Sequence, residues 1–246
     1  MISRWGVLYA SLVFVAVIAG GCAYAWDIGR GDEMSIKVIT ATCMITAAFL
    51  LLIDLLPARR LVILDLNGII VFRKFAPVIE TEAPELLPFL ASATLLDKTY
   101  TWTRPHAREF VEYLLDNFNV AIWSSAWPQN VELVVKHVFG DRRKELVFEW
   151  SQAETEKIVP HPDPAKTIPL FKKDLSMVAY RHPHLAHNGM IIIDDSHWKT
   201  MDNDPSQVLL VDSWEPHRGD GGLDTGLAPG KPIRNALERF KNTSFL

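Results

Sequence analysis

The stretch LVILDLNGII, residues 61–70, sets the pattern from which the fold class of this chain follows. It begins with a run of apolar side chains, several of them β-branched, which is typical of a strand buried on both faces of a sheet. The run stops at Asp65, and the polar Asn67 and the flexible Gly68 follow. Open parallel sheets bind ligands outside the carboxyl ends of their strands, so a carboxylate at this point indicates a functional position.

After residue 60 the chain alternates short apolar stretches with stretches of helical character. Further strands are expected at 119–123, 145–150, 190–193 and 207–211. Helices are expected at 105–118, 128–139 and 232–241, each beginning at a proline that suits a first helical turn. Residues 68–103 and 151–170 contain many prolines and are expected to be irregular. This alternation predicts an α/β domain, residues 61–246, with a doubly wound, mainly parallel sheet.

Residues 1–60 have a different composition and are predicted to form a membrane anchor. Residues 5–26 carry no charge and have tryptophan at both ends, and about 22 residues are enough to cross a bilayer. Residues 38–56 form a second, weaker apolar run. Together the two segments predict a transmembrane helical hairpin. Two alternatives stay open: the second run could be a buried or interfacial helix, and Ala23-Tyr24-Ala25 could be a signal-peptidase site.

The basic residues around these two runs suggest an orientation. Arg4, Arg59 and Arg60 would lie on one side of the membrane, whereas Arg30 and Lys37 lie in the short loop between the runs. The positive-inside bias therefore places residues 57 onward in the cytosol.

The overall charge bears on the partners of the chain. Its 246 residues have a formal net charge of −4, so nucleic acid is not an expected partner. A lipid membrane and another protein are the expected partners.

Polar side chains follow three of the predicted strands. Asp65 and Asn67 follow the first, Ser124 follows 119–123, and Asp194 with Asp195 ends 190–193. Carboxylates gathered at one sheet edge repel one another unless a cation lies between them. Hard oxygen ligands favour Mg²⁺, which the sequence therefore predicts as the cofactor.

Two further side chains suit a phosphate group at the same edge. A hydroxyl between a strand and a helix, as at Ser124, can hydrogen-bond a phosphate beside helix-terminal amides. Lys173 is the candidate that would balance the negative charge.

Four short motifs carry a resemblance to a known family. They are DLNG at 65–68, WSSAWPQNVE at 123–132, KDLS at 173–176 and IIIDDS at 191–196. In this order they resemble the haloacid dehalogenase superfamily and, more closely, the RNA polymerase II C-terminal-domain phosphatase family, also called NLI-interacting-factor-like. The resemblance extends over about residues 60–215 and implies a haloacid-dehalogenase-like fold.

The resemblance also implies roles for individual residues. Asp65 would be the nucleophile that becomes aspartyl-phosphate, and a covalent intermediate divides a difficult displacement into two easier steps. Ser124, with Ser125 beside it, would hold the phosphate, and Lys173 would neutralise phosphate and nucleophile. Mg²⁺ would be bound by a set comprising the side chains of Asp65, Asp194 and Asp195 and the backbone carbonyl of Asn67.

The chain departs from the family pattern at one catalytic position. The family has Asp-x-Asp, in which the second aspartate protonates the leaving alcohol and later activates water, whereas this chain has Asn67. An amide has no proton to exchange at a useful pKa. General acid–base catalysis is typically worth about 10²–10⁴-fold in rate, so slow turnover is expected.

Two functions follow from these observations. The first is a membrane-anchored, Mg²⁺-dependent serine/threonine phosphoprotein phosphatase that faces the cytosol from the endoplasmic reticulum or nuclear envelope. The second is a non-catalytic scaffold or receptor, as in the phosphatase-like subunit of the mitochondrial presequence translocase, which would favour the mitochondrial inner membrane. Asn67 favours the second function, whereas the retained Asp65, Ser124, Lys173 and Asp194 favour the first.

Overall fold

A computed structural model describes residues 59–218 and 224–242 of the chain. The predicted membrane segments 5–26 and 38–56 lie outside these residues. Within the two described ranges, no helix is both long enough and apolar enough to cross a bilayer.

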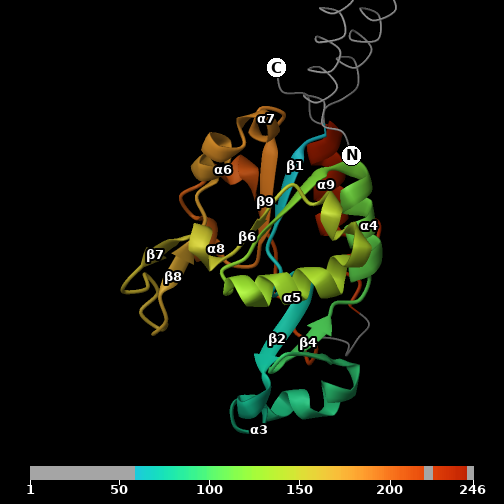
Figure 1. The fold of residues 1–246 in the computed structure, drawn as a ribbon, viewed down its shortest axis with the longest axis vertical. Helices are drawn as coiled ribbons and strands as arrows, with labels where there is room; N and C mark the ends of the chain where they lie inside the picture. The colour runs from blue at the N-terminus through green and yellow to red at the C-terminus, as the bar shows by residue number, and fades with distance from the viewer. Residues whose placement is uncertain (1–58, 219–223, 243–246) are drawn as a thin grey trace, which may run out of the picture. The chain divides into compact units, whose positions relative to one another are not determined.

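A five-stranded sheet forms the centre of the domain (Figure 1). Its strand order is β10-β9-β1-β5-β6, and every neighbouring pair is parallel. The strands are β1 (Leu61–Leu64), β5 (Asn119–Trp123), β6 (Glu149–Trp150), β9 (Met190–Asp194) and β10 (Val208–Leu210). The predicted α/β class with a mainly parallel sheet is therefore confirmed.

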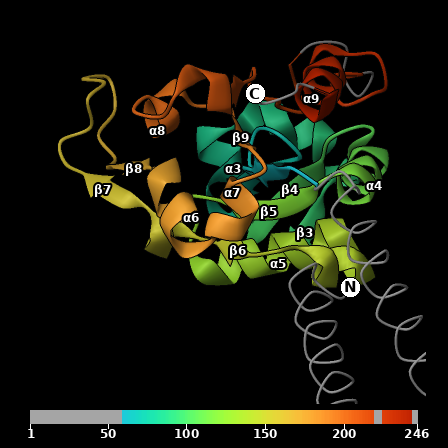
Figure 2. The same ribbon diagram turned by 90° about the horizontal axis from the view of Figure 1, so that it is seen from above.

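Helices cover both faces of this sheet, as a doubly wound fold requires (Figure 2). Val62 and Leu64 of β1 face a core formed with α4 (Ala107–Asn117), α5 (Pro128–Phe139) and α9 (Pro232–Asn242). The alternate residues, Leu61 and Ile63, face a second core with α6 (Leu175–Arg181) and α7 (Pro183–Ala186). Because β1 is apolar on both sides, both of its faces can be buried.

The long helices begin and end at residues whose backbone preferences suit those positions. Helix α5 has Pro128 in its first turn, where the missing N–H is not needed. It ends at Gly140, whose φ of 52° is in the left-handed region that glycine tolerates. The predicted bounds of α5 are therefore correct, and α4 and α9 lie within two residues of their predicted ends.

Residues 68–103 were expected to be irregular, and the structure corrects this. They form an antiparallel sheet of order β2-β4-β3, whose strands are β2 (Val71–Phe75), β3 (Thr94–Leu96) and β4 (Thr99–Thr103). The prolines lie outside the strands, in 3₁₀ helices at Ala76–Val78 and Pro84–Ser92 that flank α3 (Ile79–Glu82). The expectation was wrong because prolines mark connections and do not exclude strands between them.

Residues 151–170 were also expected to be irregular, and this expectation was wrong for the same reason. They include a short 3₁₀ helix at Gln152–Glu154, strand β7 (Glu156–Ile158) and the first residue of β8 (Leu170–Lys172), and the two strands pair as an antiparallel hairpin. Their prolines fall in the connection between the strands.

The strand expected at 145–150 is shorter than predicted. Residues Gly140–Glu145 form a 3₁₀ helix, and β6 is only Glu149–Trp150. Arg142 holds this helix by donating to both oxygens of Glu145 at 2.8 Å. The remaining elements are α8 (His197–Thr200) and a 3₁₀ helix at Pro205–Gln207.

Candidate functional site

Asp65 and Asp194 lie side by side at the carboxyl edge of the central sheet. Strands β1 and β9 are parallel neighbours, with Leu64 opposite Ile193. The Asp65 N–H donates to the carbonyl of Ile193 at 3.0 Å, which continues the ladder by one residue. Relative solvent exposure is 1% for Asp65 and 0% for Asp194, so both carboxylates need positively charged partners.

Lys173 supplies one of these partners from the end of the β7–β8 hairpin. Its Nζ lies 2.5 Å from Asp194 Oδ2 and 3.2 Å from Asp65 Oδ1. The Lys173 side chain is fully buried, and its backbone carbonyl accepts a hydrogen bond from Asn203 Nδ2 at 2.8 Å. The hairpin that sequence reasoning missed is therefore the element that delivers the predicted lysine.

Lys199 supplies a second partner, which sequence reasoning missed. From α8, its Nζ lies 3.0 Å from Asp65 Oδ2 and 3.4 Å from both Asp194 Oδ1 and Asp195 Oδ1. The sequence signal for this contact was weak: Lys199 follows Asp195 by four residues, but Asp195 precedes α8, so the helical i, i+4 rule does not apply directly.

These contacts shift the protonation equilibria of the cluster. Burial acts to raise the pKa of Asp65, but the charges of Lys173 and Lys199 outweigh it and lower that pKa to about 2. For Asp194, burial together with the neighbouring Asp65 carboxylate raises the pKa. Burial acts to lower the pKa of Lys199, yet the surrounding carboxylates raise it overall. Asp65 is thus held ionised, as a nucleophile must be.

Gly68 allows the loop after β1 to lie close to the acidic cluster. Its φ is +80°, and a Cβ at this position would collide with the carboxylate of Asp195 and lie 2.5 Å from Ser213 Oγ. The backbone conformation favours glycine here, and a larger residue would also force the Asp195 and Ser213 side chains to move.

Asn67 lies on the exposed side of the same loop. Its backbone forms an isolated bridge with Val71, and the Gly68 N–H donates to the Val71 carbonyl at 2.7 Å. Nothing in the structure tests the predicted use of the Asn67 carbonyl as a metal ligand, so that role stays a prediction.

Ser124 and Ser125 directly follow β5, the strand that pairs with β1. Ile122 of β5 is opposite Leu64, so Ser124 comes just beyond the residue level with Asp65. Ser124 is buried and its Oγ accepts from the Ala126 N–H at 3.4 Å, whereas Ser125 is half-buried. Both serines are at the predicted edge, and their binding of phosphate stays a prediction.

The acidic cluster has the chemistry of a magnesium site. Asp65, Asp194 and Asp195 each offer an oxygen, and these oxygens lie within 4.8 Å of one another. Among the described residues, the buried Asp65 Oδ1 has no aligned hydrogen-bond donor, although Lys173 is near. An all-oxygen set with a lone pair to spare fits Mg²⁺.

Comparisons with known proteins place this arrangement in context. The chain is 26% identical over 161 residues to an uncharacterized FCP1 homology domain-containing protein of Schizosaccharomyces pombe, an overlap of 63% of this chain and 61% of that protein. Similar solved structures include Fcp1, an RNA polymerase II CTD phosphatase, with 15% identity, a TM-score of 0.44 and coverage of 74% of this chain and 52% of that one.

A second solved structure is a variant of the fission yeast Fcp1 phosphatase bound to beryllium fluoride. It has 14% identity and a TM-score of 0.42, with coverage of 79% of this chain and 52% of that one. The chain thus spans about half to three fifths of the length of these relatives.

A family model covers most of the described domain. The model of the NLI interacting factor-like phosphatases matches residues 60–238, from the start of β1 into α9. The chain therefore belongs to the NLI interacting factor-like phosphatase family.

Proposed function

We propose that this chain is a slow, Mg²⁺-dependent phosphatase of phosphoserine or phosphothreonine proteins, held at a membrane by residues 5–26 and 38–56. The observation that carries the proposal is the state of Asp65: its carboxylate is buried, has a lowered pKa and is contacted by the ammonium groups of Lys173 and Lys199. Membership of a phosphatase family supports the same chemistry.

Asp65 acts first as the nucleophile. An Asp65 carboxylate oxygen forms a bond to phosphorus while the bond from phosphorus to the ester oxygen breaks, which leaves phosphate on Asp65 and releases an alkoxide. Lys173 balances negative charge beside the transferring group. Asp65, Asp194 and Asp195 would hold Mg²⁺, which when bound supplies further positive charge toward the phosphoryl oxygens.

Protonation of the leaving oxygen is then the slow part of the first step. Asn67 donates no proton at a useful pKa, so the alkoxide takes its proton from water. In the second step a water attacks phosphorus, its proton passes to solvent, and the bond to the Asp65 oxygen breaks with release of inorganic phosphate. Without a side-chain base this step also loses part of the 10²–10⁴-fold gain that general catalysis typically gives, which is why turnover is slow.

The test uses the full-length chain purified in mild detergent. We expect Asn67→Asp to raise the rate of phosphate-ester hydrolysis with Mg²⁺ by about 10²-fold or more, because it restores an acid and base. Asp65→Asn should abolish hydrolysis. If neither substitution changes the rate, the catalytic assignment is wrong.

A second candidate is a receptor that keeps the fold without efficient chemistry. The specific observation in its favour is the combination of Asn67 with Lys199, whose ammonium contacts all three carboxylates. Labelled phosphate trapped on Asp65 after incubation with a phosphorylated substrate would support the enzyme, and a receptor would show partner binding without that label.

The cellular location belongs to the same proposal. An enzyme of this kind would face the cytosol from the endoplasmic reticulum or nuclear envelope, whereas a receptor of the translocase type would lie in the mitochondrial inner membrane. The charge distribution around the apolar runs supports the cytosolic orientation, and the family resemblance supports the two candidate membranes.

A further inference from the structure

We propose that Lys199 is a tethered cation that competes with Mg²⁺ for the cluster of Asp65, Asp194 and Asp195, so that metal binding requires its ammonium group to leave. The inference deepens the proposed function and rests on the use of Mg²⁺ at this site.

The Lys199 ammonium group occupies the place that a metal ion would take. The Lys199 Nζ lies 3.0 Å from an oxygen of Asp65 and 3.4 Å from an oxygen each of Asp194 and Asp195. These are the same three carboxylates whose oxygens lie within 4.8 Å of one another. Mg²⁺ binds oxygens at about 2.0–2.1 Å and needs several of them, so the ammonium and the ion cannot share this volume.

The two lysines of the cluster differ in their exposure to solvent. Lys173 is fully buried, and its backbone N–H donates to the Lys199 carbonyl at 2.7 Å. The Lys199 side chain is 19% exposed and therefore has a path to solvent. Lys199 can turn its side chain outward while its backbone stays bound, whereas Lys173 has no such route.

The net charge of the cluster also favours a divalent ion. Three carboxylates face two lysines, which leaves an excess of one negative charge when all of them are ionised. A divalent ion in place of the Lys199 ammonium balances the cluster more fully, so Mg²⁺ at sufficient concentration replaces the lysine. The Lys199 ammonium weakens the apparent affinity because its own attraction to the acids must first be lost.

The experiment measures Mg²⁺ binding to the full-length chain in detergent by titration calorimetry. Lys199→Met should bind Mg²⁺ about tenfold more tightly than the wild type, because no tethered cation must be displaced. Lys172→Met is the matched control: Lys172 pairs with Glu156 and Asp202 outside the cluster, so the affinity should not change.

Melting temperatures measured with and without Mg²⁺ show whether the Lys199→Met variant is folded. Lys199→Met should have a lower melting temperature than the wild type in a chelator, and Mg²⁺ should raise it more than it raises that of the wild type. Lys199→Arg keeps the charge and should keep the weak affinity. An additional Asp194→Asn substitution should remove the gain in affinity of Lys199→Met, which ties the gain to this cluster.

The outcomes separate this inference from the proposed function. Unchanged or weaker Mg²⁺ affinity in Lys199→Met overturns the competition, whatever the hydrolysis assays of Asp65 and Asn67 variants give. Tighter binding in Lys199→Met supports the competition even if the wild type hydrolyses no phosphate ester, in which case it is the phosphatase proposal that fails.

Discussion

At the scale of single residues, Gly68 and Gly230 together separate two effects of adding a side chain: the strain of a positive φ and the crowding around the new Cβ. Its positive φ resembles that of Gly230, at +76°, but a Cβ on Gly230 would meet nothing within 4 Å. Gly230→Ala therefore measures the backbone penalty alone, about 1–2 kcal/mol. Gly68→Ala should lower the free energy of unfolding by about 1–3 kcal/mol more, because its Cβ also displaces Asp195. Urea denaturation measures both losses. If Gly68→Ala and Gly230→Ala lower the free energy of unfolding equally, the crowding around Gly68 does not contribute.

Lys173 gives a second prediction at this scale. Lys173→Met should lower the free energy of unfolding by about 3–5 kcal/mol, because it deprives two buried carboxylates of their shared partner. Lys172→Met removes an ammonium group with exposed partners and should cost about 1 kcal/mol or less. Urea denaturation of both variants makes the comparison, and similar losses would contradict the described burial.

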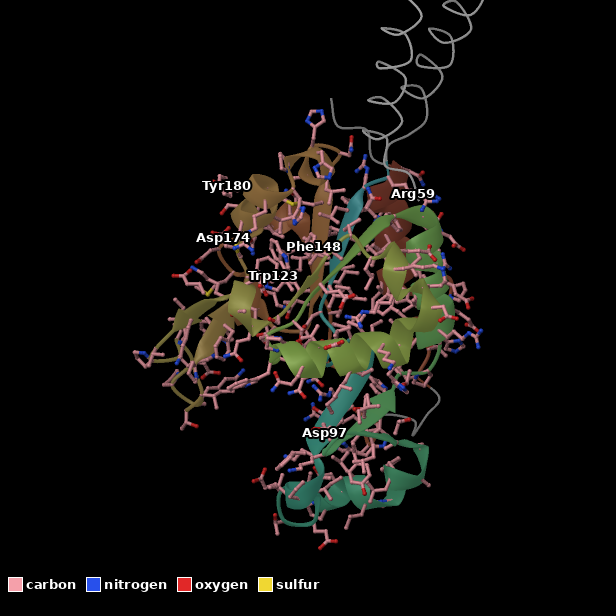
Figure 3. All side chains as sticks on the ribbon, in the orientation of Figure 1. Arg59, Asp97, Trp123, Phe148, Asp174 and Tyr180 are labelled. Atoms are coloured by element: carbon pink, nitrogen blue, oxygen red, sulfur yellow. The ribbon has the colours of Figure 1, made fainter. Side chains whose placement is uncertain are left out.

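At the scale of elements, the ring cluster between α6 and the edge of the sheet predicts a dependence on pH. His182 stacks on Phe148 with ring centroids 4.8 Å apart, next to Trp150 (Figure 3 labels Phe148). Burial lowers the pKa of His182, and the charges of His184 and Arg181 lower it further. The unfolded chain therefore binds the proton more strongly than the folded one, and stability falls as pH drops below the ordinary histidine value of about 6.5.

His182→Phe keeps a ring in the stack and has no proton to bind. Its free energy of unfolding should vary less than that of the wild type as the pH is lowered from 7 to 5. His187→Gln, a change at an exposed position, should keep the wild-type pH dependence. Parallel curves for wild type and His182→Phe would argue against this assignment.

The elements also show what the sequence could predict. Helix α5 has Pro128 at its start and Gly140 at its end, and β1, β5 and β9 are uninterrupted apolar runs, so local signals were enough. The sheet β2-β4-β3 was missed because its strands are short and separated by prolines, and because its stability comes from tertiary packing such as that of Trp102 against Phe72. The acidic residues could be predicted because they follow strands. The position of Lys199 depends instead on how α8 packs against the acidic cluster.

At the scale of the whole molecule, the apolar runs before residue 60 give a prediction about location. The full-length chain should stay with membranes after alkaline carbonate extraction, because the apolar runs at 5–26 and 38–56 are predicted to span the bilayer. Protease added to intact vesicles of the endoplasmic reticulum should digest the domain that begins near residue 60, because the positive-inside bias places it outside them. Detergent-opened vesicles provide the control. Release by carbonate would contradict the anchor, and protection in intact vesicles would reverse the topology.

The exposure of Asn67 has an evolutionary consequence. Asn67 is exposed, and aspartate has nearly the same shape as asparagine, so an exchange between the two at this position needs no repacking of the core. Asparagine and aspartate codons differ by a single nucleotide. Under the proposed mechanism, one base substitution is therefore enough to move a lineage carrying this domain between slow and fast turnover.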